Sequence, residues 1–114
     1  MAAHGTMGGR QQPQIHTQLL RRTLAGATPQ EAVAAPRFVV GARDSGSVTD
    51  RVLAEPALDA RVREQLLRCH LPVVDPDGFD DVGHAMISRR SADGSLAAGA
   101  DPRSDGAVLI TQAR

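Results

Sequence analysis

Hydrophobic and polar positions follow two different periods along this chain, and each period predicts a different kind of element. Residues 13 to 25 show the period of a helix, because their larger side chains and a threonine recur on one side every three or four positions. These positions are Ile15, Leu19, Leu20, Thr23 and Leu24. Pro13 suits a first helical turn and Gly26 ends the pattern, so the sequence predicts a helix between them.

A second, shorter helix is predicted from its start signal. The tetrapeptide Thr28-Pro29-Gln30-Glu31 is a capping box, with a hydroxyl at the N-cap, proline at the first helical position and a carboxylate at the third. The alanine-rich run that follows stops before Pro36, because proline cannot continue a helix. The sequence therefore predicts a short capped helix that ends at residue 35.

A third helix is predicted over residues 57 to 69, ALDARVREQLLRC. One stripe of this segment is apolar and the opposite side is charged, which is typical of an amphipathic helix packed on one face. The stripe consists of Leu58, Val62, Leu66 and Cys69. Because a cysteine at the end of such a stripe is usually a core residue, we expect Cys69 to be buried.

Short β-branched runs between turn residues predict the strands. Residues 37–41 and a return strand over 48–55 enclose the turn at 44–47, and 71–74 forms the next strand, before a turn at 75–78. The segments 83–90 and 95–100 form a hairpin around Ser91-Ala92-Asp93-Gly94. The apolar run 107–110 is compatible with an edge strand. This order predicts an α+β fold with helices layered on an antiparallel sheet.

Composition narrows the possible functions. The chain has 114 residues, enough for one domain at most. Its 13 basic residues balance 13 acidic ones, so the net charge does not favour binding to nucleic acid. Every basic residue is arginine, which excludes P-loop and Schiff-base lysine chemistry. No apolar run is long enough to cross a membrane. The N-terminal residues lack the apolar stretch of a signal peptide, so the sequence as it stands predicts a cytoplasmic location. The compartment of the whole protein stays open, because an export signal could lie on a part outside this sequence.

The residue types that usually bind metals are not spaced as ligands. The histidines His4, His16, His70 and His84 are scattered. The acidic positions Asp75, Asp77, Asp80 and Asp81 lack the glycine and glutamate spacing of a calcium loop and are interpreted as a solvated turn. No GxSxG motif orders a catalytic triad. We therefore predict no metal and no cofactor.

Two further motifs carry potential chemistry. In Gly5-Thr6-Met7-Gly8-Gly9, adjacent glycines allow main-chain N–H groups to approach an anion. Taken alone, this segment is interpreted as a flexible N-terminus, because no strand is expected before it. Asp101-Pro102-Arg103 places a carboxylate and a guanidinium beside a rigid proline, which favours pinning of the hairpin end over substrate binding.

Four segments, taken in order, resemble a known family. They are GTMGGRQQPQIHTQLL, TPQEAVAAPRFVVG, LAEPAL and GADPRSDGA, between Gly5 and Ala107. Together they resemble the C-terminal part of the small subunit of gamma-glutamyltransferase. The resemblance implies an N-terminal-nucleophile hydrolase, made as a proenzyme that cleaves itself to expose a threonine. It also implies a four-layer αββα sandwich, of which residues 1–114 form an incomplete C-terminal fragment.

The resemblance implies a catalytic role for Gly8 and Gly9, whose N–H groups would form the oxyanion hole. The nucleophilic threonine and the groups that hold the glutamyl moiety would lie upstream of Met1, so the implied partners are the large subunit and the nucleophile-bearing part of the small subunit. The substrate would be a γ-glutamyl small molecule. Thr6-Met7 stands where many members have Ser-Pro, which resembles the gamma-glutamyltransferase-like subgroup.

Two functions therefore remain open at this point. The first is a fragment of a transferase or hydrolase that acts on glutathione-like donors and is inactive alone. The alternative is a non-catalytic scaffold or partner subunit that completes a split or truncated protein.

Overall fold

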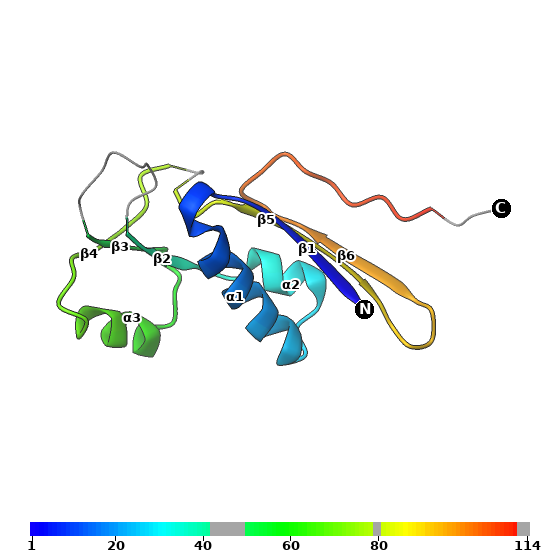
Figure 1. Cartoon of the computed structure of the whole chain (residues 1–114), viewed down its shortest axis with the longest axis horizontal. Helices are drawn as coiled ribbons and strands as arrows, with labels where there is room; N and C mark the ends of the chain where they lie inside the picture. The colour runs from blue at the N-terminus through cyan, green and yellow to red at the C-terminus, as the bar shows by residue number, and fades with distance from the viewer. Residues whose placement is uncertain (42–49, 79–80, 112–114) are drawn as a thin grey trace.

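The computed structural model describes residues 1–41, 50–78 and 81–111, and it contains two three-stranded sheets. One sheet has the strand order β1-β5-β6 and lies beside α1 and α2; the other has the order β2-β3-β4 and lies beside α3 (Figure 1). The elements are β1 Ala2–Met7, α1 Gln12–Leu24, α2 Pro29–Ala34, β2 Phe38–Val40, β3 Val52–Ala54, α3 Ala60–Leu67, β4 Val73–Val74, β5 His84–Arg90 and β6 Leu96–Ala100. This arrangement confirms the α+β class.

The N-terminal segment is a strand, so the interpretation of a flexible N-terminus is wrong. β1 pairs antiparallel with β5, with Ala2 opposite Arg89 and Met7 opposite His84. Alanine and glycine have low strand propensity, so the hydrogen-bond ladder to β5 stabilises this strand and the propensity of its own residues does not. Only the partner strand, more than 75 residues away, shows that the segment is extended.

The hairpin of β5 and β6 confirms the sequence prediction, and Ser91 and Ser95 close it through a main-chain hydrogen bond of 2.9 Å. The run 107–110, by contrast, forms no strand. It runs past the outer side of the sheet, where Val108 and Leu109 line a hollow together with sheet residues. The expectation of an edge strand there is therefore wrong, because the run makes no ladder with any described strand.

Helix α1 confirms the prediction for residues 13 to 25, although its buried stripe is narrower than expected. Ile15 and Leu19 are fully buried, whereas Leu20 is 50% exposed and Leu24 is 78% exposed. A short 3₁₀ turn, Gly9–Gln11, precedes the helix. The sheet therefore covers only one narrow side of α1.

Helix α2 has the predicted capping box. The Glu31 N–H donates to Thr28 Oγ1 at 3.2 Å, and the Thr28 N–H donates to Glu31 Oε2 at 2.8 Å. Both bonds satisfy amides that a helix start would otherwise leave free. Ala32 and Val33 then point into the core over the first sheet.

The second sheet is antiparallel only in part. β2 and β3 pair antiparallel as predicted, but β3 and β4 pair in parallel, so the expectation of a purely antiparallel sheet is wrong. The reason is α3, which connects β3 to β4 and returns the chain to the same end of the sheet. The turn expected at 44–47 and the first two residues of its return strand lie outside the described residues.

Helix α3 lies within the predicted range of 57 to 69 but begins later, at Ala60, where Asp59 is the N-cap and its Oδ1 accepts from the Arg61 N–H at 2.9 Å. Leu66 is buried, but Val62 is 38% exposed and Cys69 is exposed. The expectation of a buried Cys69 is therefore wrong. The helix ends at Leu67, and Cys69 lies in the turn beyond it, where the helical phase that would direct its thiol inward no longer applies.

The close contact between α2 and β6 depends on Gly99. A Cβ at this position would lie 2.5 Å from the Pro29 carbonyl oxygen and 2.7 Å from the Gln30 nitrogen. Both neighbours are main-chain atoms of α2, which cannot move without displacing the helix. The helix therefore packs directly on the backbone of the strand.

We expect Gly99→Ala to lower the free energy of unfolding by about 1–3 kcal/mol, because overpacking a tight contact costs this much. Urea denaturation followed by circular dichroism measures the change. The matched control is Gly106→Ala, whose added Cβ meets only ordinary contacts at 3.5 and 3.8 Å. Equal stability of the two variants would show that α2 shifts freely on the sheet.

Candidate functional site

The Gly8-Gly9 turn lies between the end of β1 and the start of α1. Gly9 has a φ of +53°, in the left-handed region that favours glycine. The Gly8 carbonyl accepts from the Gln11 N–H at 3.0 Å, and the Gly9 carbonyl accepts from the Gln12 N–H. The start of the helix therefore engages both carbonyls of the turn.

The Gly8 N–H is directed away from the rest of the sheet. Met1 and Arg90 exchange two hydrogen bonds, so the alternation of an antiparallel ladder makes Met7 and His84 a bonded pair. The Met7 carbonyl thus faces β5, and in a trans peptide the next N–H points the opposite way. This direction is the open edge of β1, the outer strand of its sheet.

Neither glycine amide has a hydrogen-bond acceptor within residues 1–41, 50–78 and 81–111. Gly8 is buried and Gly9 is exposed, so the two amides lie at the boundary between core and surface. Adjacent unengaged N–H groups are the donors that an oxyanion hole requires. The sequence-predicted residues Gly8 and Gly9 thus lie in one turn, and their N–H groups have no acceptor in the described part of the chain.

Gly83 packs against this turn and was missed by the sequence analysis. Its φ is +67°, and a Cβ there would lie 2.4 Å from the Met7 carbonyl oxygen and 3.3 Å from the Gly8 Cα. A Cβ at Gly8 would in turn lie 2.8 Å from Ile15 Cδ1. Gly83 therefore requires glycine, whereas a Cβ at Gly8 would have to displace the end of the Ile15 side chain. Only the Gly8 motif is visible in the sequence.

Two histidines that are distant in the sequence lie beside the turn. His16 Nε2 is 2.9 Å from Thr6 Oγ1, and the His4 and His16 rings stack with centroids 6.4 Å apart. Gln12 Nε2 also donates to the Thr6 carbonyl at 3.2 Å. These contacts join the end of β1 to α1, and across the described part of the chain no group of His, Cys, Asp and Glu is arranged to hold a metal ion.

A buried ionic network surrounds Asp101 and Arg103. Asp101 Oδ2 pairs with Arg37 and accepts from the Ala85 N–H at 2.9 Å, while its Oδ1 accepts from Arg103 Nη1 at 2.9 Å. Arg103 Nε and Nη2 each donate to Glu55 at 2.6 Å. The predicted pinning of the hairpin end is thus confirmed. Sequence reasoning missed Arg37 and Glu55, since they are 64 and 48 residues from their partners.

The network shifts the acid–base properties of its members. Burial by itself would raise the pKa of Asp101, but the Arg103 N–H, the charge of Arg37 and the side-chain hydrogen bonds of both arginines outweigh it and lower that pKa. Burial and the charge of Arg103 lower the pKa of Arg37. Burial also opposes the charge on Arg103, but its hydrogen bonds to Glu55 and Asp101 raise its pKa. Asp101 therefore stays ionised to a lower pH than a free aspartate does.

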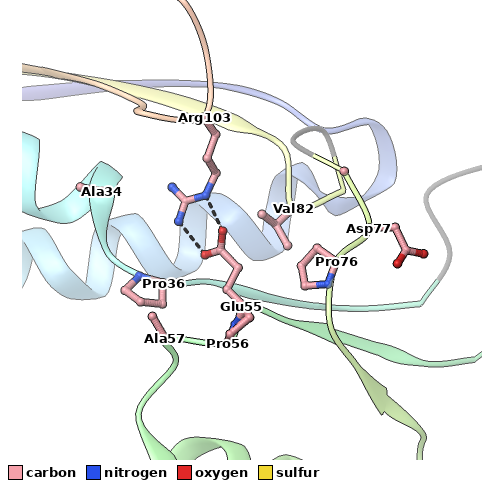
Figure 2. A pocket seen from close by; sticks show the side chains of 10 residues that line it. Ala34, Pro36, Glu55, Pro56, Ala57, Pro76, Asp77, Val82 and Arg103 are labelled. Atoms are coloured by element: carbon pink, nitrogen blue, oxygen red, sulfur yellow. Dashed lines mark hydrogen bonds and ion pairs between the residues drawn. The ribbon is translucent and has the colours of Figure 1, made fainter.

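The Glu55–Arg103 pair lies at a pocket of about 540 Å³, between the end of α2, the end of β3 and the turn near Pro76 (Figure 2). Its other lining residues are Ala34, Pro36, Pro56, Ala57, Asp77, Gly78 and Val82. The two charged side chains bind each other in a bidentate pair, and Gly8 and Gly9 are not part of the lining. The pocket is thus separate from the turn.

Comparison with solved structures places the fold among N-terminal-nucleophile hydrolases. A cephalosporin acylase from Bacillus halodurans superimposes with a TM-score of 0.79 and 30% identity, over 97% of this chain and 20% of that one. The transpeptidase CapD from Bacillus anthracis superimposes with a TM-score of 0.73 and 21% identity, over 96% of this chain and 63% of that one. The sequence identity to CapD is low, so that similarity shows the fold alone.

Residues 1–111 match the family model for gamma-glutamyltranspeptidase, and the chain belongs to this family. It is 35% identical over 108 residues to the glutathione hydrolase-like YwrD proenzyme of Bacillus subtilis, covering 93% of this chain. It is 37% identical over 110 residues to the oxamate amidohydrolase proenzyme of Klebsiella pneumoniae, covering 92%. The chain spans about a fifth of the length of both relatives, so further parts of the protein are implied. None of the described helices is both long and apolar enough to span a bilayer.

We expect the stability that Asp101 contributes to depend on pH. Because its pKa is lower in the folded chain than in the unfolded one, its contribution is complete above the unfolded pKa of about 4 and is lost as the pH falls through the folded pKa. Urea denaturation between pH 3 and 7 should show the advantage of the wild type over Asp101→Asn narrowing below about pH 4. Asp105→Asn, at an exposed carboxylate, should follow the wild type throughout. A constant gap between wild type and Asp101→Asn would contradict this.

Proposed function

We propose that this chain supplies the oxyanion-binding turn and part of the sheet of a γ-glutamyl transferase or hydrolase. The observation that carries the proposal is the pair of adjacent amides, from Gly8 and Gly9, which have no acceptor in the described part of the chain and lie at the open edge of β1. Membership of the gamma-glutamyltranspeptidase family supports this role, because the resemblance implies a catalytic function for these two glycines.

The proposed reaction is acyl transfer through a covalent intermediate. A threonine hydroxyl from the nucleophile-bearing part of the protein attacks the γ-glutamyl carbonyl carbon, and the carbonyl electrons move onto oxygen. The Gly8 and Gly9 N–H groups donate to this oxyanion. When the carbonyl re-forms, the C–N bond breaks, the amine leaves with the proton that the threonine hydroxyl gave up, and an acyl-enzyme remains. Water or the amine of an amino acid then attacks the ester and releases the threonine.

The remaining layers of the proposed αββα sandwich would come from other parts of the protein. α1 and α2 cover one face of the sheet β1-β5-β6 (Figure 1). The opposite face carries Met86 and Leu96, which are 65% and 56% exposed, with Ala98 and Ala100 beside them. An apolar face of this kind favours association. We therefore propose that the second sheet, from the large subunit or the nucleophile-bearing part, packs there.

The acyl donor is proposed to be a glutathione-like γ-glutamyl amide. The two curated relatives are named for different substrates, glutathione in one and oxamate in the other. Both are small carboxylate-bearing amides, and both must present a carbonyl to an attacking nucleophile. Activity on a γ-glutamyl anilide, compared with activity on oxamate, distinguishes the two.

The alternative function is a non-catalytic scaffold or partner subunit. The observation that favours it comes from the 540 Å³ pocket. There Glu55 and Arg103 bind each other, and Arg103 also binds the backbone, so neither charged group is directed at a ligand. In this function the chain completes another protein by contact alone. The substitution experiments below separate this alternative from the catalytic role.

We expect the purified chain alone to show no γ-glutamyl hydrolysis above background, because an oxyanion hole without a nucleophile retains little of a catalytic unit. Release of the anilide, measured with and without the missing parts, tests this expectation. The control is Thr6→Val, which removes the hydroxyl paired with His16. Turnover by the chain alone that disappears in Thr6→Val would place the nucleophile in this chain and overturn the proposal.

In the assembled protein, we expect replacement of the Gly8 or Gly9 amide by an ester to lower kcat by about 10²–10³-fold with little change in KM, because each change removes one oxyanion donor. The corresponding α-hydroxy acid, introduced at the chosen codon, removes the N–H without adding a side chain. The same exchange at Gly26, whose N–H donates to Thr23 at the end of α1, is the control. Unchanged kcat in both test variants would favour the scaffold function.

A further inference from the structure

The buried guanidinium of Arg37 is only partly paired. Its side chain is fully buried, and Nη2 makes both of its hydrogen bonds, to Asp101 and to the Gly83 carbonyl. Nε and Nη1 have no acceptor among the described residues. Apolar residues of similar volume often stabilise a fold as well as a buried ion pair does. Stability alone therefore does not account for an arginine at this position.

Arg37 holds the segment that faces the end of β1. Its Nη2 donates to the Gly83 carbonyl at 3.2 Å, and its partner Asp101 accepts from the Ala85 N–H at 2.9 Å. These two contacts lie on either side of His84, which is opposite Met7 in the ladder. The Arg37–Asp101 pair thus fixes the backbone directly across from the last residue of β1.

Gly83 passes this constraint on to the Gly8-Gly9 turn. A Cβ at Gly8 would lie 3.7 Å from the Gly83 Cα, and one at Gly83 would lie 3.3 Å from the Gly8 Cα. The two backbones are therefore in direct contact, and the Ile15 side chain packs against both glycines. Protein interiors are close-packed, so a shift of one backbone segment displaces the segment that it contacts. A displacement of Gly83 must move Gly8.

We propose that Arg37 is a positioning residue that sets the direction of the Gly8 and Gly9 amides by holding the Gly83 carbonyl. Arginine suits this task because its planar, always charged fork can bind a carboxylate and a carbonyl at fixed relative positions. Lysine presents a compact point charge and would keep the contact with Asp101 or with Gly83, but not both in the same geometry. The catalytic consequence of this inference rests on the proposed function, whereas the structural coupling does not.

Hydrogen exchange of single amides tests the coupling without any substrate. The Gln11 and Gln12 amides donate to the carbonyls of Gly8 and Gly9, so their protection reports the geometry of the turn. In Arg37→Lys we expect exchange at these two amides to rise by about tenfold or more, because misplacing the turn opens their bonds. The Arg63 amide in α3, which donates to Asp59, should keep its exchange rate.

Two further variants make the exchange result decisive. Arg63→Lys changes an arginine of a half-exposed pair with Asp75 and should leave Gln11 and Gln12 unchanged. Gly83→Ala keeps Arg37 but displaces Gly8 directly, so it should reproduce the Arg37→Lys pattern and decides the matter if Arg37→Lys does not fold. Unchanged exchange at Gln11 and Gln12, an equal rise across α3, or unfolding of both variants would overturn the proposal.

Kinetics of the assembled protein test the catalytic consequence separately. We expect Arg37→Lys to lower kcat on a γ-glutamyl anilide on the order of 10²-fold while KM stays within a factor of about two, because misplaced oxyanion donors affect the transition state. Arg63→Lys should match the wild type. An exchange response without activity in any variant would contradict the proposed function and leave the positioning role intact. A kcat that is unchanged in Arg37→Lys would overturn the catalytic consequence.

Discussion

The buried pairing of Arg37 with Asp101 is the interaction on which the rest of the structure depends. It brings together the residue that precedes β2 and the residue that follows β6, one from each sheet. Arg103 extends the pairing to Glu55 at the end of β3 and donates to the carbonyls of Val33 and Ala35. Removing one partner of such a pair would leave an uncompensated buried charge, which typically costs 3–5 kcal/mol.

This network separates the two regions of chemical interest. On one side Arg103 and Glu55 line the pocket, where their hydrogen bonds leave them little capacity for a ligand. On the other side Arg37 reaches the Gly83 carbonyl and thereby the turn with unengaged amides. The same ion pairs thus line the pocket on one side and fix the position of the Gly8-Gly9 turn on the other. The turn depends on this contact because β1 is the outer strand of its sheet and pairs with β5 alone among the described strands.

Local sequence patterns were sufficient to predict the helices, the hairpin and the capping box, because the residues that signal each of them lie within a few positions of each other. Two kinds of feature could not be obtained in this way. The strand at the N-terminus and the ion pairs of Arg37 and Glu55 depend on partners 48 to 89 residues away. The prediction that Cys69 is buried was wrong because the helix ends at Leu67, two residues before the apolar pattern ends. The Gly8-Gly9 pair could be predicted from its sequence motif. Gly83, which packs against that pair, belongs to no recognisable motif.

The pairing of β1 with β5 also determines the order in which the fold can form during synthesis. Met1 and Arg90 bond to each other although they are 89 residues apart, so β1 has no partner in its sheet until synthesis has reached β5. The capped helix α2 depends only on local contacts and can form much earlier. β1 is therefore made before α2 but paired after α2 can form. Until then its edge is open to other chains, and a chaperone or the neighbouring part of the protein has time to act on it.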